Sequence, residues 1–253
     1  MNGEMAQMSN IVISARFALR DKGKMDCPLD KYVSSIKFVF IPRGIFLKKT
    51  KTVDSVTDWF EICRKQGLED IKYLVPTSIS DRSILGFSNT SQNSMICFWK
   101  DGSVTYFSSR WKFDRDQEGW DVTYEEHEWK DAPSGKPSFE NHTEEFKQVL
   151  LDIEDLAKRI DFDSFAMVFH KAYESLCGNY DEENTFLPAN LPEAFRGIYL
   201  AVMKADVFGA MGSWNDSPPY YAHEKGLDKE YNELSDQLLE QLRYNLMYVV
   251  NEC

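Results

Sequence analysis

The chain has 253 residues, of which 43% are hydrophobic and 14% aromatic, a composition that excludes an intrinsically disordered protein. The net charge is −12, and the whole imbalance lies in the second half: residues 1–130 carry 19 basic and 18 acidic side chains, residues 131–253 carry 10 and 23. Such an acidic half repels duplex nucleic acid and anionic membranes, so we expect neither as a partner. We interpret it first as a solvated surface and second as a surface for a basic partner or a cation.

The cysteines are scattered and odd in number, and no Cys-x-x-Cys occurs: Cys27, Cys63, Cys97, Cys177 and Cys253. This pattern predicts reduced thiols in a cytoplasmic protein rather than a disulfide framework or a structural zinc site. No apolar run reaches the length of a transmembrane helix, and the N-terminus does not resemble a signal peptide. We therefore expect a cytoplasmic protein that does not enter membranes.

The first part of the chain predicts strands and one helix. From Ile11 to Leu19, apolar and polar side chains alternate with a period of two, which is typical of a half-buried strand. Residues 33–41 are β-branched and aromatic and predict an interior strand, after a loop at 21–31. Further predicted elements are a turn at 42–44, a strand at 45–49, a helix at 52–66 capped by Thr52, and a strand at 71–75.

The strongest β signal is the Asp-Gly pair at 101–102, which lies between two apolar runs, 95–99 and 104–107. This arrangement predicts a hairpin. Residues 110–113 continue its second strand, and residues 120–129 predict a third strand after a charged turn. We therefore expect residues 1–130 to form an antiparallel meander with one helix.

Residues 131–138 (DAPSGKPS) predict a linker. Beyond it the apolar period changes from two to 3.6, which predicts an acidic subdomain of about four helices over residues 139–253. The predicted fold class is therefore α+β, with an N-terminal antiparallel β-sheet followed by a C-terminal α-helical bundle. The four helices are expected from Phe146 to Ile160, from Phe162 to Leu176, from Pro192 to Gly209, and from Leu227 to Val250.

A long segment at 209–225, between the last two helices, has no regular period. Connections of this length are usually functional, packed or disordered, and the large side chains here favour an ordered loop. This loop supplies the candidate binding residues Met211, Trp214, Asn215, Asp216, Tyr220 and His223.

Two interpretations of this loop compete. Trp214 could stack on a ligand while Asp216 and His223 act as acid–base groups, in which case they should line one concave pocket. Alternatively, Trp214 fills a gap between helices while Asn215 and Asp216 bond to loop backbone, and we favour this structural interpretation.

No catalytic constellation, metal-ligand set or cofactor site is predicted. His170 and Cys177 lie about 10 Å apart along one predicted helix, too far for a nucleophile–base pair. Glu126 and Glu128 share a strand face and could hold a cation, but a solvated strand edge is the preferred interpretation. Residues 110–115 combine basic and aromatic side chains and could bind single-stranded nucleic acid, although acidic neighbours cancel their field.

We therefore expect a non-catalytic protein-interaction protein, which meets a protein partner or its own copy through the aromatic loop and the acidic helical surface. The alternative is an enzyme or small-ligand-binding protein with its site at residues 209–223 and Asp216 or His223 as base. A further alternative is an acidic decoy for a nucleic-acid-binding protein.

Overall fold

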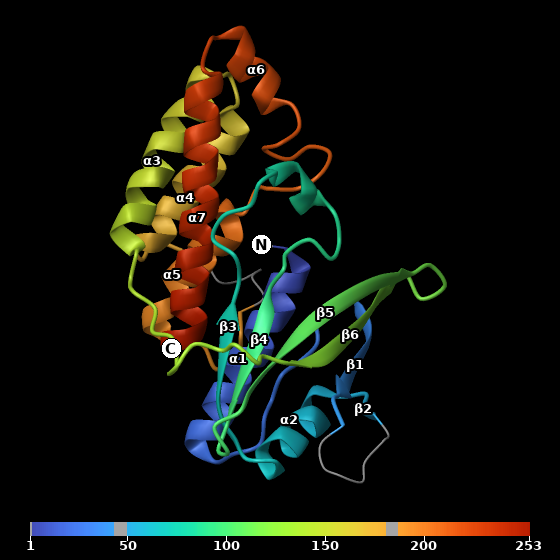
Figure 1. The fold of residues 1–253 in the computed structure, drawn as a ribbon. Coiled ribbons are helices and arrows are strands. Elements are labelled where there is room, and N and C mark those ends of the chain that lie inside the picture. The colour runs from blue at the N-terminus through green and yellow to red at the C-terminus, as the bar shows by residue number, and fades with distance from the viewer. Residues whose placement is uncertain (1, 43–49, 181–186) are drawn as a thin grey trace.

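The computed structural model describes residues 2–42, 50–180 and 187–253, and these form one six-stranded mixed sheet and seven α-helices (Figure 1). The strands are β1 (Val33–Phe40), β2 (Lys51–Val53), β3 (Leu68–Leu74), β4 (Ser94–Trp99), β5 (Val104–Asp114) and β6 (Gly119–Glu128). The helices are α1 (Gly3–Asp21), α2 (Val56–Lys65), α3 (Thr143–Arg159), α4 (Asp163–Leu176), α5 (Glu193–Ala205), α6 (Pro218–Glu224) and α7 (Asp228–Glu252), with a 3₁₀ turn η1 (Arg82–Gly86).

The strand order in the sheet is β2-β1-β6-β5-β4-β3. Strands β3 to β6 pair antiparallel in chain order, and the predicted hairpin joins β4 to β5. Strand β1, however, pairs parallel with β6. The sheet as a whole is therefore mixed rather than the simple antiparallel meander that the sequence suggested, because the connection that brings β1 beside β6 is long-range and leaves no local signal.

The strand predicted from Ile11 to Leu19 is wrong, because these residues lie in α1. Ile11, Val12 and Ile13 are consecutive, and each is at most 1% exposed. A helix that is buried on all sides shows no period of 3.6, so its β-branched run looked like a strand. The side chain of Asn2 accepts a hydrogen bond from the N–H of Glu4 (2.8 Å) and caps the start of this helix.

Helix α2 begins later than expected. Its N-cap is Ser55, whose Oγ accepts a hydrogen bond from the N–H of Asp58 (3.0 Å), whereas Thr52 lies in β2. The predicted strand at 45–49 and most of the turn before it lie outside the described residues.

Helices α1 and α2 lie on one face of the sheet, which we call the inner face (Figure 1). There the ring of Phe38 in β1 stacks on Trp59 of α2, with centroids 4.9 Å apart. The alternate residues of each strand point to the opposite, outer face, which includes Ile96 of β4 and Tyr106 of β5.

Helices α3, α4, α5 and α7 pack on one another beside the β3 end of the sheet (Figure 1). The predicted apolar stripe from Phe146 to Ile160 is confirmed, since its members are buried. Helix α5 ends at Ala205, earlier than expected. Residues 218–224, predicted as irregular, form α6, because two prolines suit the first turn of a helix. None of the helices in the described ranges has the length and apolarity that crossing a bilayer requires.

Helix α7 meets the sheet at its C-terminal end. The side chain of Asn251 donates to the carbonyl of Tyr73 and accepts from its N–H, both at 2.7 Å. The ammonium of Lys72 donates to the carbonyl of Asn251 (3.0 Å). Because β3 is an edge strand, the two bonds of Asn251 satisfy backbone groups of Tyr73 that would otherwise be open for pairing with another strand. One cluster of buried apolar side chains includes residues of both halves, and the division into two subdomains stays a prediction.

We predict that Asn251→Ala lowers the free energy of unfolding by about 2–4 kcal/mol, because it leaves both backbone groups of Tyr73 buried without a partner. Urea unfolding followed by far-UV circular dichroism measures this. Asn232→Ala, at an exposed position of the same helix, is the matched control and should cost less than about 1 kcal/mol. Equal losses in the two variants would contradict the role of Asn251.

The carboxylate of Glu154 in α3 joins two helices, since it accepts from Lys158 (2.6 Å) and from Nδ1 of His170 in α4 (3.1 Å). Burial acts to raise the pKa of Glu154, but the hydrogen bonds from Lys158 and His170 outweigh burial and lower the pKa. The stabilisation is therefore present above the ordinary glutamate pKa and is lost as pH falls through the lowered value. Wild type should lose stability relative to Glu154→Gln on acidification below about pH 4.5. Urea unfolding at a series of pH values measures this. A stability difference between the two proteins that does not change with pH would contradict the role of Glu154.

Candidate functional site

The predicted loop is anchored by Trp214, which has no solvent exposure. Its indole packs edge-on against Phe169 of α4 and stacks on Tyr231 of α7, with centroids 5.2 and 5.3 Å apart. Nε1 donates to Oγ of Ser235 (2.8 Å), and the backbone carbonyl accepts from the hydroxyl of Tyr231 (2.5 Å). Trp214 therefore fills a gap between helices.

The other polar loop residues bond to backbone. Asn215 donates to the carbonyl of Arg82 (2.9 Å), and Asp216 accepts from the N–H of Gly212 (2.8 Å). Gly86 of η1 approaches the loop so closely that a Cβ there would lie 2.6 Å from the nitrogen of Ala210. These contacts agree with the structural interpretation of the loop, in which Asn215 and Asp216 bond to backbone.

Three candidate residues lie at the surface instead. Met211 is 94% exposed and Tyr220 62% exposed. His223 is exposed and pairs through Nδ1 with Asp228 (2.9 Å). None of the six candidate residues lines the two hollows of about 720 and 830 Å³ on the outer face of the sheet, and a binding role for the loop stays a prediction.

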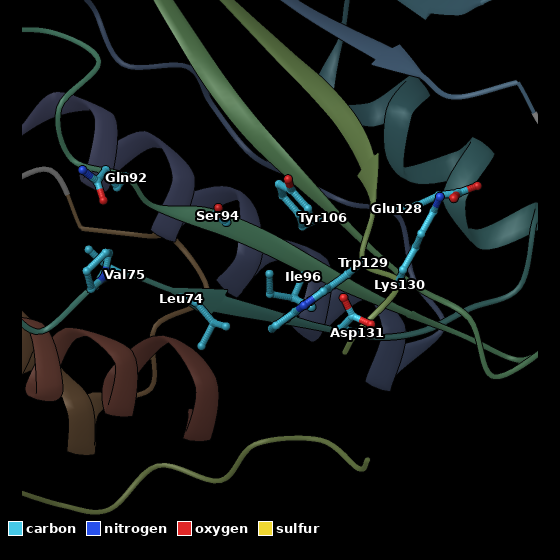
Figure 2. A pocket seen from close by; sticks show the side chains of 11 residues that line it. Leu74, Val75, Gln92, Ser94, Ile96, Tyr106, Glu128, Trp129, Lys130 and Asp131 are labelled. Carbon is cyan, nitrogen blue, oxygen red and sulfur yellow. The ribbon is translucent and has the colours of Figure 1, made fainter. Parts of the chain in front are cut away.

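A hollow of about 720 Å³ lies elsewhere, on the outer face of the sheet. We call it the outer groove (Figure 2). It is lined by Leu74, Val75, Pro76, Gln92, Ser94, Ile96, Tyr106, Glu128, Trp129, Lys130 and Asp131.

Strand pairing explains the floor of the outer groove. Ser94 pairs with Leu74 of β3, and Ile96 pairs with Tyr106 of β5. These four residues therefore occupy neighbouring positions on one face of three adjacent strands. They give the floor an aliphatic side over β3 and an aromatic side over β5.

Trp129 lies beside Ile96 in Figure 2 and forms a wall of the groove. Its N–H donates to the carbonyl of Val104 (3.1 Å), which fixes the chain at the end of β6. The ring of Tyr106 stacks on His127, with centroids 5.0 Å apart, and Nε2 of His127 lies 3.0 Å from Oγ of Ser108. The two aromatic groups of the groove are thus each held by a neighbouring strand.

Polar groups lie at both ends of the groove. Figure 2 shows Gln92 at one end and Glu128, Lys130 and Asp131 towards the other. Gln92 has a φ of 55°, a left-handed backbone conformation that residues other than glycine adopt at a cost in free energy. The turn before β4 therefore holds this amide at the rim under local strain.

A second hollow of about 830 Å³ shares Glu128, Trp129 and Lys130 with the outer groove. Residues 132–136, which belong to the segment predicted as a linker, form part of its lining. The ammonium of Lys136 bonds to Glu69 (2.9 Å) and lies over the ring of Phe98 on the outer face, 5.9 Å from its centroid. Residues 132–136 thus cross this face beside the groove.

The interpretation of Glu126 as part of a solvated edge is wrong, because this carboxylate is only 4% exposed. It accepts from Oγ1 of Thr105 (2.9 Å) and from the N–H of Ile41 (3.1 Å). These donors satisfy the buried carboxylate, whereas Glu128, two residues on, is exposed at the end of β6.

The basic and aromatic residues at 110–115 divide between the two faces of β5. Trp111 is buried on the inner face, and Arg110 and Lys112 are exposed on the outer face. The groove residues themselves were missed. Ile96 and Tyr106 carried a signal, since they are apolar or aromatic on the face of the hairpin opposite its core-facing residues.

The chain matches no family model, and no curated protein or solved structure is significantly similar to it.

We predict that Trp214→Ala lowers the free energy of unfolding by about 3–5 kcal/mol, because it empties a fully buried site and removes the partner of Ser235. Trp129→Ala, at a half-buried position of the groove, is the matched control and should cost less than half as much. Guanidinium unfolding of both variants measures this. A larger loss for Trp129→Ala would contradict the structural role of Trp214.

Proposed function

We propose that the protein is a non-catalytic protein-interaction protein, which holds an extended segment of a partner polypeptide in the outer groove. The observation that supports this best is the open groove with an apolar centre and polar ends. Its volume of about 720 Å³ lies within the range of roughly 300–1,000 Å³ that is usual for ligand sites.

The length of the groove suits a peptide. The floor runs from Gln92, in the turn before β4, to Ile96 of β4, which is at most about 13 Å at the rise of about 3.3 Å per strand residue. About four extended residues fit this length. A side chain of the segment would enter between Trp129 and Tyr106, in the manner of the apolar anchors that dominate many interfaces.

The polar ends suit the backbone of such a segment. The amide of Gln92 and the hydroxyl of Ser94 can both donate and accept hydrogen bonds, as a peptide backbone requires. The segment would lie across the sheet face rather than extend the sheet at β3, because Asn251 already occupies backbone groups of that edge.

The loop and the helical half contribute further contacts in this proposal. Met211 and Tyr220 place exposed side chains at the surface. Exposed aromatic and methionine side chains are enriched in interfaces. The acidic half would then orient the partner through its charge rather than hold it.

A photo-crosslinking amino acid at Tyr106 tests the proposal in lysate of the source organism, with Lys229 on α7, whose side chain is 88% exposed, as the control position. Irradiation should join a defined polypeptide to position 106 but not to position 229. Adding Trp129→Ala should reduce this adduct at least about fivefold, since the variant removes one wall of the site.

Mass spectrometry identifies the adducts. The same polypeptides at both positions, or an adduct indifferent to Trp129→Ala, would contradict the proposal. A small molecule bound by wild type and not by Trp129→Ala, with no polypeptide adduct, would also contradict it.

A further inference from the structure

We infer that the partner segment is acidic on one side of its apolar anchor, because the outer face beside the groove carries three cations that form no ion pair within the described part of the chain. The inference rests on the function proposed above. The three are Lys37 of β1 and Arg110 and Lys112 of β5, and we call them the outer cation cluster.

Strand pairing places the cluster on one surface. Lys37 and Arg110 both pair with Thr123 of β6, one from each side. Lys112 follows Arg110 by two residues and therefore points the same way. All three side chains are exposed.

Among the described residues, no carboxylate forms an ion pair with any member of the cluster, whereas Arg16, Arg64 and Arg82 each have an acidic partner. Asp121 faces Lys112 across the ladder, but it accepts a hydrogen bond from Ser35. Asp121 and Glu125 of β6 and Asp114 of β5 hold neighbouring positions of this face and equal the cations in number, but Asp114 accepts from the N–H of Asp116 (2.8 Å) rather than pairing with the cluster. The cluster therefore has unused capacity for anions.

The cluster lies within reach of a segment that occupies the groove. Along β5, Tyr106 and Arg110 are four residues apart, which is about 13 Å. Ser108 lies between them and pairs with Ser94 of the groove floor. A segment of about seven extended residues that follows β5 from Tyr106 to Lys112 would therefore contact both the groove and the cluster.

A short acidic peptide fits this surface better than a nucleic acid does. The protein carries a net charge of −12, so a long polyanion meets repulsion from the rest of the molecule. A peptide with a few carboxylates meets mainly the nearby cations, because charges beyond about 8 Å are screened at physiological salt. The aliphatic floor at Leu74 and Val75 also suits side chains rather than stacked bases.

Selection from a phage-displayed library of random ten-residue peptides tests the inference on the full-length protein. We expect wild type to enrich an apolar or aromatic residue together with Asp or Glu a few positions away. The double variant Arg110→Glu/Lys112→Glu should lose the acidic preference and keep the apolar one. Both positions are exposed, so this variant should fold.

Fluorescence anisotropy with the selected peptide, labelled and synthesised, gives the size of the effect. The double variant should raise its Kd about tenfold, and the difference should shrink as salt is added. Lys229→Glu, an exposed reversal on α7, is the matched control and should leave Kd within about twofold.

The possible failures are distinguishable. Enrichment of apolar residues without acidic ones, or with basic ones, overturns this inference and leaves the groove as a peptide site. No enrichment over an unrelated protein, or binding indifferent to Trp129→Ala, overturns the proposed function as well. Tighter binding of a twelve-residue oligothymidylate than of the selected peptide, lost in the double variant, assigns the cluster to single-stranded nucleic acid and overturns the acidic peptide.

Discussion

The contact on which the rest of the structure depends joins Asn251 of α7 to both backbone groups of Tyr73 in β3. It attaches the last helix of the bundle to the sheet, and it occupies an edge that would otherwise be open to another strand. Arg16 donates to the carbonyl of Ile71 and so occupies a further backbone group of the same edge, while Lys72 of β3 donates to the carbonyl of Asn251 in α7. Because this edge is taken, a partner on this side of the sheet must approach through its outer face.

That face divides into an apolar part and a cationic part for a simple geometric reason. The inner face is covered by α1 and α2, so core residues occupy every second strand position. The remaining positions point to the outer face and need not be apolar. Over β3, β4 and β5 these positions hold Leu74, Ile96 and Tyr106. Nearer β1 they hold Lys37 and Arg110. In the proposed function, a single extended segment contacts both parts. Its apolar anchor then provides affinity, and its charged flank provides specificity.

Features with local causes could be predicted from the sequence. The Asp-Gly pair at 101–102 specified the hairpin, and the stripe from Phe146 to Ile160 specified a helix. Helix α1 could not be recognised, because burial on every side removes the period that distinguishes a helix from a strand. The groove could not be predicted either, since it requires β3, β4 and β5 to lie side by side and Trp129 to return over them. Of the large side chains of the loop at 209–217, Trp214 is buried in the core, whereas Met211 is exposed, a difference that the sequence pattern did not indicate.

The most direct test of a peptide-binding outer face is an experimental structure of the protein with its bound partner segment. We predict that the segment crosses β4 and β5, inserts an apolar side chain beside Trp129, and directs a carboxylate towards Arg110. A segment paired with the edge strand β2, or one seated against the loop at 209–217 with the groove empty, would contradict the account.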